Sequence, residues 1–192
     1  MSNQELRENI VLKRSDEELR ALSVKGDGNA QNELYRRYAP KLWGVCLRYA
    51  KNTMSAEDIL QEGFIRIFTY LDRFEDKGSF EGWMRRTMVN TAINYYKKNL
   101  SSAREAEYHE YQSGKSNEAD ALSSMSHQEL LALIQKMPNG YRTVFNLYII
   151  EGYSHKDIAK SLNISENTSK SQLSRARSFL QEQIKNIYGE ER

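Results

Sequence analysis

The chain has 192 residues, of which 39% are hydrophobic, and its 28 basic and 26 acidic side chains leave a net charge of +2. This length and composition fit one domain or two small ones, each able to bury a core. The single cysteine, Cys46, excludes an internal disulfide and a cysteine-rich metal cluster and fits a reducing compartment. Because no apolar run approaches the ~20 residues of a membrane span and the first residues lack a signal-like apolar stretch, we expect a cytoplasmic protein without membrane insertion.

Helix starts are marked by a repeated pattern, a serine followed three residues later by an acidic side chain. The pattern occurs at Ser15, Ser55, Ser126 and Ser154, each time ahead of apolar residues at helical spacing. In such a capping box the serine side chain accepts a hydrogen bond from the third helical amide, and the acidic side chain accepts one from the serine amide. With only two prolines, ten glycines and no sustained two-residue alternation, the sequence predicts an all-α fold.

The helix expected to begin at Ser55 has two distinct faces. Its apolar stripe, predicted to be buried, consists of Leu60, Phe64, Ile67, Phe68 and Leu71. Its opposite face, called the acidic face below, consists of Asp58, Gln61, Glu62 and Ile65. An isoleucine ringed by carboxylates and an amide suits a protein contact better than water, and the alternative interpretation is a solvated surface.

The helix expected over residues 79–98 is also two-faced. Its core side is predicted to hold Met88, Val89, Ala92, Tyr95 and Tyr96. Its other side, called the polar face below, carries Trp83, Arg86, Asn90, Asn94 and Lys97. Cations bind phosphates, amides pair with base edges, and an aromatic ring can stack on an unpaired base, so this face favours a nucleic-acid contact. The alternative is a wet surface with Trp83 in the core. The polar segment 73–80, which contains Gly78, is expected to be a loop.

A polar segment divides the chain. Residues 101–120 contain no Leu, Ile, Val, Met, Phe or Trp, and their charges are mostly acidic. Such a stretch buries too little apolar surface to offset its ordering entropy. We therefore predict two small helical domains, at 1–100 and 122–192, joined by a flexible acidic linker at 101–121.

Residues 152–180 predict a helix-turn-helix motif. A preceding helix over 141–150 is expected to place Tyr141, Val144, Phe145 and Tyr148 on one face. A short helix with Ile158, Ala159 and Leu162 then leads to a turn at Asn163, a residue that tolerates left-handed backbone, and Ser165 is placed to cap the second helix.

The second helix of this motif has an unusually polar side. Its core stripe is predicted to be Leu173, Ala176, Leu180 and Ile184. Its other side carries Asn167, Lys170, Ser171, Ser174, Arg175 and Ser178. Short hydroxyls let a backbone approach a DNA groove, while lysine and arginine reach bases and phosphates. The alternative is an ordinary helical hairpin within a bundle.

Residues 55–98, beginning "SAEDILQEGFIRIFTYLDRF", and residues 122–184, which contain "SENTSKSQLSRARS", resemble conserved regions two and four of bacterial extracytoplasmic-function (ECF) sigma factors of RNA polymerase. The order, the spacing and the omission of other sigma regions also match. The resemblance implies a non-enzymatic factor that directs core polymerase to promoters and promotes strand opening, with the helix-turn-helix reading the minus-thirty-five element.

The resemblance also implies site residues and partners. Docking on the clamp helices of the largest polymerase subunit is expected of Asp58, Gln61, Glu62 and Ile65. Contact with the minus-ten element, including capture of an extruded base by the 74–79 loop, is expected of Phe74, Glu75, Asp76, Lys77, Trp83, Arg86, Asn90, Asn94 and Lys97. Contact with the minus-thirty-five element is expected of Ser165, Asn167, Thr168, Lys170, Ser171, Ser174, Arg175 and Arg177, with Lys170 and Ser174 at base-reading positions. Further partners are the flap of the second polymerase subunit, double-stranded and melted promoter DNA, and an anti-sigma factor.

Two residues depart from the family pattern. Asn163 stands where the family often has glycine, which asparagine replaces at modest cost. Ser169 stands where a valine is usual, within the core stripe of its helix, so its packing is expected to differ.

Other functions fit the sequence less well. His109, His127 and His155 lie apart, no glycine-rich phosphate loop occurs, and the acidic "AEDILQE" segment has no second acidic cluster for a metal nuclease. We therefore expect no catalytic site, metal or cofactor. Two alternatives remain, a free-standing helix-turn-helix regulator with an N-terminal partner or sensor domain and an interaction protein that binds only protein. The regulator class leaves the polar stripe from Trp83 to Lys97 unexplained.

Overall fold

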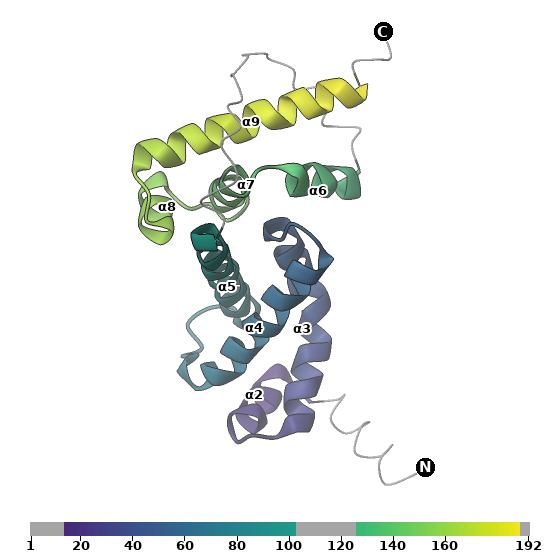
Figure 1. Cartoon of the computed structure of the whole chain (residues 1–192). Helices are drawn as coiled ribbons and strands as arrows, with labels where there is room; N and C mark the ends of the chain where they lie inside the picture. Colours follow the sequence, from purple (N-terminus) through teal and green to yellow (C-terminus); the bar gives the residue numbers. More distant parts are fainter. Residues whose placement is uncertain (1–13, 103–125, 189–192) are drawn as a thin grey trace. The chain divides into compact units, whose positions relative to one another are not determined.

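The computed structural model describes residues 14–102 and 126–188, and its regular elements are all helical (Figure 1). The predicted all-α fold in two helical parts is confirmed. Contacts divide the described residues into two compact units, one within 1–46 and 56–91 and the other within 47–55 and 92–192. The linker expected over 101–121 lies outside the described residues, except that residues 101 and 102 complete the last turn of α5.

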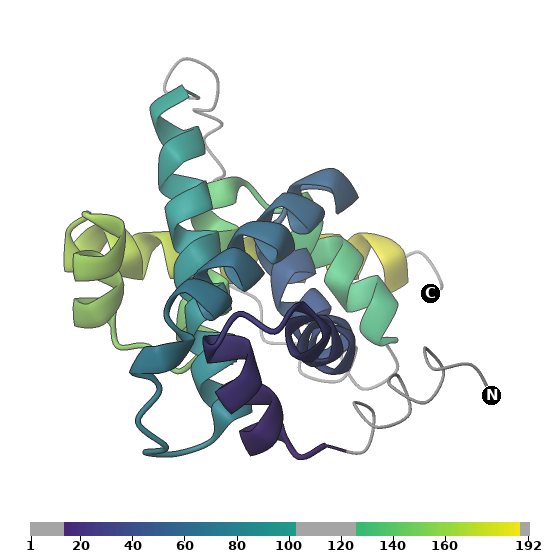
Figure 2. The ribbon, with the colours of Figure 1, turned by 90° about the horizontal axis from the view of Figure 1, so that it is seen from below.

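The N-terminal unit is built mainly from helices α2, α3 and α4, the short 3-10 turn η1 and the first part of α5. Their bounds are Asp16–Val24, Gly28–Tyr49, Thr53–Thr69, Leu71–Arg73 and Phe80–Ser102, respectively. Fully buried core side chains from these elements include Leu19, Leu34, Leu42, Ile59, Ile67, Met84 and Met88. Helix α2 packs against η1 and lies beside α3 (Figure 2).

Three of the four predicted serine caps form. Ser15 and Ser126 make complete capping boxes, and the Ser154 side chain accepts a hydrogen bond from the Asp157 amide. The expected cap at Ser55 is wrong, because α4 begins at Thr53 and the Ser55 amide donates to Asn52 Oδ1 at 2.9 Å. Asparagine is as good a cap as serine, and moving the cap three residues back adds most of a turn to the helix.

Helix α4 buries most of its predicted stripe and packs closely on α5. Of the stripe, Phe68 alone is half-buried and the rest are buried. A Cβ added at Gly63 would lie 2.3 Å from the sulfur of Met88, whose side chain is fully buried. Gly63 therefore allows an approach of the two helices that a larger residue would oppose, and this approach sets the position of α5.

Hydrogen bonds and an ion pair connect α2 to α3. Arg37 Nη1 donates to Asp16 Oδ1 at 2.9 Å, and Arg37 Nε donates to Glu33 Oε1 at 2.7 Å. The Tyr38 hydroxyl donates to the second carboxylate oxygen of Asp16. Burial, and then the neighbouring Asp16 carboxylate, raise the pKa of the Tyr38 phenol, so this group remains a donor. These contacts hold α2 in position beside the loop 74–79, which follows η1.

The C-terminal unit contains α6, α7, the π-helical turn η3, α8 and α9. Their bounds are His127–Lys136, Asn139–Phe145, Asn146–Ile150, His155–Leu162 and Glu166–Tyr188, respectively. Helix α9 packs against α6, α7 and α8. One buried cluster joins α6 to α9 and consists of Leu133, Ile134, Met137, Ala176, Phe179, Leu180 and Ile184.

The single helical face expected over residues 141–150 is only partly correct. Val144 is buried, but Tyr141, Phe145 and Tyr148 are half-buried. The buried side chains of this segment include three polar ones, Arg142, Thr143 and Asn146, together with Leu147. The polar ones donate hydrogen bonds to backbone carbonyls, Arg142 to Gln135, Thr143 to Asn139 and Asn146 to Arg142. From Asn146 on, a π turn, in which the Glu151 amide donates to the Asn146 carbonyl five residues back, rotates the following side chains out of the α-helical register.

Candidate nucleic-acid interface

The turn between α8 and α9 has the geometry expected of a helix-turn-helix. Asn163 adopts left-handed backbone with φ of 57°, and the Ile164 amide donates to the Ala159 carbonyl at 3.1 Å. Ser165 then caps α9, because its Oγ accepts a hydrogen bond from the Thr168 amide at 2.9 Å. Backbone conformation and cap together set where the first turn of α9 begins.

A polar contact lies beneath α9 at Ser169, the position where the packing was expected to differ. Ser169 is fully buried, and its Oγ is hydrogen-bonded to His155 Nδ1 at 2.9 Å. The His155 ring stacks on Tyr148, with centroids 4.5 Å apart and an interplanar angle of 23°. A buried hydroxyl without a partner would be costly, and this pairing satisfies it. Sequence reasoning missed the role of His155, whose position at the start of α8 was the available signal.

The outer side of α9 is exposed and basic. The predicted core stripe, Leu173, Ala176, Leu180 and Ile184, is buried. Of the residues predicted to face DNA, Thr168 is half-buried and the exposed ones are Ser165, Asn167, Lys170, Ser171, Ser174, Arg175 and Arg177. Ser178 is half-buried. This α9 polar face therefore combines short hydroxyl and amide groups with three cations, a composition suited to a phosphate-lined groove.

The acidic face predicted from the sequence lies on α4 and is called the α4 acidic face from here on. It is open to solvent along its length, because Asp58, Gln61 and Glu62 are exposed and Ile65, at its C-terminal end, is 61% exposed. Glu62 is paired with Arg66 one turn later at 2.8 Å. An apolar side chain left exposed among carboxylates on a rigid helix is the geometry of a small docking surface.

The polar face predicted from the sequence lies on α5 and is called the α5 polar face from here on. It is exposed except at Trp83. Arg86, Asn90, Asn94 and Lys97 are exposed, whereas Trp83 is half-buried. The Trp83 ring stacks on Phe80 at a centroid distance of 6.1 Å and lies 5.6 Å from the ring of Phe74. The indole thus belongs neither to the core nor to an open surface, but forms part of an aromatic cluster at the edge of the helix.

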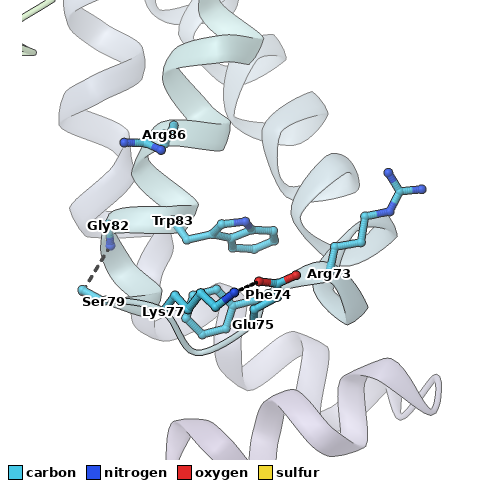
Figure 3. A pocket seen from close by; sticks show the side chains of 8 residues that line it. All are labelled: Arg73, Phe74, Glu75, Lys77, Ser79, Gly82, Trp83 and Arg86. Atoms are coloured by element: carbon cyan, nitrogen blue, oxygen red, sulfur yellow. Dashed lines mark hydrogen bonds and ion pairs between the residues drawn. The ribbon is translucent and has the colours of Figure 1, made fainter.

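A hollow of about 420 Å³ lies at this cluster (Figure 3). It is lined by Arg73, Phe74, Glu75, Lys77, Ser79, Gly82, Trp83 and Arg86. Lys77 pairs with Glu75 at 2.7 Å. The charges of Arg73 and Arg86 therefore give the lining a net positive charge beside the rings of Phe74 and Trp83. A planar ring carried on an anionic backbone is the kind of ligand that such a lining accommodates.

The loop that forms one rim of the hollow has an unusual backbone. Asp76 has φ of 54° and Gly78 has φ of 106°. Ser79 ends the loop, since its Oγ accepts a hydrogen bond from the Gly82 amide at 3.2 Å. Sequence reasoning placed the loop correctly but missed Phe80 and Arg20, which contact its residues through tertiary structure.

Comparison with known proteins identifies both parts of the chain. Residues 34–101 match the model of sigma-70 region 2, and residues 127–180 match the model of sigma-70 region 4. The ECF sigma factor SigW of Bacillus subtilis is 30% identical over 85% of this chain and 93% of its own length. The chain belongs to the ECF sigma factors of RNA polymerase.

Other proteins are also similar to this sigma factor. The sigma-E factor of Escherichia coli is 30% identical over 83% of this chain and 89% of its own. The sigma-H factor of Pseudomonas aeruginosa is 26% identical over 94% and 100%. A crystal structure of the sigma factor RpoE in complex with the anti-sigma factor NepR, from Bartonella quintana, has a TM-score of 0.49 and 20% identity, over 80% of this chain and 96% of that one.

An ECF sigma factor is a non-catalytic subunit of RNA polymerase that directs the enzyme to promoters for transcription initiation. This sigma factor therefore binds core polymerase and promoter DNA, and the expectation of a protein that is not an enzyme is confirmed. The region 2 match accounts for the N-terminal helices, which a free-standing regulator leaves unexplained.

Among residues 14–102 and 126–188, no three His, Cys, Asp or Glu side chains form a group that could hold a metal ion. No helix within the same two ranges is long and apolar enough to cross a bilayer.

Proposed function

We propose that residues 1–100 dock on core polymerase and open the minus-ten element, while residues 122–192 read the minus-thirty-five element. The observation that carries the proposal is the cation-rimmed aromatic hollow beside the 74–79 loop, at the start of the α5 polar face. Strand opening needs a site that binds an unpaired base favourably, and a hollow with an aromatic stacking surface is such a site.

Opening in this proposal follows from a free-energy balance. Extruding a base from a duplex costs a few kcal/mol, and stacking on an aromatic side chain returns about 1–3 kcal/mol per base. Trp83 supplies the stacking surface, while Arg73 and Arg86 at the rim attract the phosphates on either side. Farther along α5, the exposed amides of Asn90 and Asn94 are placed to contact upstream bases.

Recognition of the minus-thirty-five element is assigned to the α9 polar face. Lys170 and Ser174 lie about one helical turn apart, and both are exposed, so we assign them to base edges in the major groove. Arg175 and Arg177 are assigned to backbone phosphates, which add affinity without adding sequence information. The cap at Ser165 and the buried Ser169–His155 pair support this assignment, because they hold α9 rigidly against α8.

Docking on polymerase is assigned to the α4 acidic face, with the clamp helices of the largest subunit as its partner. The flap of the second subunit is the proposed partner of residues 122–192. An anti-sigma factor that restrains the protein, and a place in the bacterial cytoplasm at the nucleoid, are further parts of the proposal. They rest on membership of the ECF sigma factors.

Run-off transcription with bacterial core polymerase and a library of randomised promoters tests the whole proposal. We expect transcripts only from templates that carry two conserved elements separated by a fixed spacer. Substitutions on α9 should change the upstream element, whereas substitutions around the hollow should change the downstream one. If neither the substitutions on α9 nor those around the hollow change the selected promoter sequences, the assignment of the two elements to the two parts of the chain is wrong.

A further inference from the structure

Arg20 of α2 reaches across to the loop that forms the rim of the hollow. Its Nη2 lies 2.6 Å from Asp76 Oδ1, and its guanidinium carbon lies 4.7 Å from the ring centroid of Phe74 and 5.1 Å from that of Phe80. The Arg20 side chain is only 14% exposed, although Asp76 is 70% exposed. One cation thus contacts the middle of the loop and an aromatic residue at each end of it.

These contacts act on the parts of the loop that determine its shape. Phe74 lines the hollow and is packed between the Arg20 guanidinium and the Trp83 ring. Asp76 has the left-handed backbone that few residues adopt readily, and its ion pair with Arg20 favours that conformation. A planar guanidinium suits this place because it can stack on rings and bind a carboxylate at once.

We propose that Arg20 is a positioning residue that holds the 74–79 loop in the shape that receives an unpaired base, before DNA arrives. The inference rests on the proposed function of the hollow. Helix α2 is suited to the task because Asp16 ties it to α3 through Arg37 and Tyr38. Arg20 also lies outside residues 34–101, the segment that matches region 2. A site held in shape beforehand loses less conformational entropy when it binds.

The shape of the loop is tested first in the free full-length protein. Trypsin cleaves after Lys77, an exposed residue within the loop, and the rate of this single cut reports how often the loop opens. Arg20→Gln should accelerate the cut about tenfold. Lys25→Ala, an exposed substitution just beyond the end of α2, should leave it unchanged. An unchanged rate in Arg20→Gln overturns the inference, whatever transcription shows.

A second variant keeps the test valid if Arg20→Gln fails to fold. Asp76→Asn removes the charge from an exposed side chain and retains a residue that tolerates left-handed backbone. It should accelerate cleavage after Lys77 severalfold without changing the melting temperature. If cleavage is unchanged in this variant, the ion pair does not hold the loop and the inference is wrong.

Promoter opening is then measured by permanganate reactivity of unpaired thymines in the holoenzyme. Arg20→Gln should lower opening about tenfold, leave affinity for core polymerase unchanged, and reduce discrimination between the preferred minus-ten element and a substituted one. Loss of folded protein alone would not change that discrimination. Faster cleavage with normal opening and discrimination would overturn the positioning role. Normal opening in Trp83→Ala would instead overturn the proposed function of the hollow, so the two failures are distinguishable.

Discussion

Charge reversal on the α4 acidic face, by Asp58→Arg with Glu62→Arg, should separate polymerase binding from folding. Both side chains are exposed, and both lie opposite the buried stripe of α4. The substitution removes the ion pair between Glu62 and Arg66, which lie 2.8 Å apart. An exposed pair one turn apart contributes about 0.3–0.5 kcal/mol, and the like-charge pair that replaces it costs a similar amount. The free energy of unfolding should therefore fall by about 1 kcal/mol.

Binding should suffer far more than folding. Replacing attraction by repulsion at an interface costs several kcal/mol. A loss of about 4 kcal/mol shared by the two positions corresponds to a roughly thousandfold weaker complex, since each 1.4 kcal/mol is a factor of ten. Ile65, exposed about one turn beyond Glu62, would then lose its apolar contact as well.

The assay is a titration of fluorescently labelled protein with core polymerase, accompanied by a thermal melt followed by circular dichroism. A matched control, Glu17→Arg with Glu182→Arg, changes two exposed carboxylates outside α4 and gives the same change in net charge. We expect the control to bind core polymerase within about threefold of the wild type, by ordinary screening of distant surface charges. Wild-type affinity in the folded Asp58 and Glu62 double variant would refute the assignment of this face.

Three further predictions concern DNA. Lys170→Ala or Ser174→Ala should change which upstream element is preferred, whereas Arg175→Ala or Arg177→Ala should weaken binding to all sequences and flatten its salt dependence; uniform effects from both groups in a competition assay would count against the base readers. Trp83→Ala should slow strand opening roughly ten- to hundredfold, for a stacking contact of ~1–3 kcal/mol, with closed-complex binding nearly unchanged in footprints. The protein without polymerase should discriminate promoter from scrambled duplex poorly at physiological salt, because its net charge is only +2; thousandfold discrimination by the free protein would disprove this.

The sequence was sufficient where structure depends on neighbours along the chain. The cap at Ser165, the left-handed turn at Asn163 and the apolar spacing from Leu173 onward are local signals, and the structure reproduces each. The α4 stripe was predictable for the same reason. The cap at Ser55 failed because Asn52 offers an equally good local signal, and two such signals compete without a rule that ranks them.

Tertiary contacts limited the prediction of the site. Periodicity placed Trp83 on the polar side of α5, but it could not show that Phe74 and Phe80 would cover part of its ring. Nor could spacing predict that a residue of α2 would reach the loop, since Arg20 carries no local pattern of its own. The buried polar side chains of Arg142, Thr143 and Asn146 were also missed, because their hydrogen bonds to backbone carbonyls leave no signal in the residue spacing.

The hydrogen bond between buried Ser169 and half-buried His155 has a consequence for re-engineering promoter preference. Grafting a foreign recognition helix onto this scaffold would replace α9 and leave α8 in place. If the incoming helix carries an aliphatic residue at position 169, His155 Nδ1 faces a methyl group instead of a hydroxyl, and the lost hydrogen bond costs about 0.5–1.5 kcal/mol. The exchangeable module is therefore α9 together with the first residue of α8, and chimaeras that split these two positions should be the less stable ones.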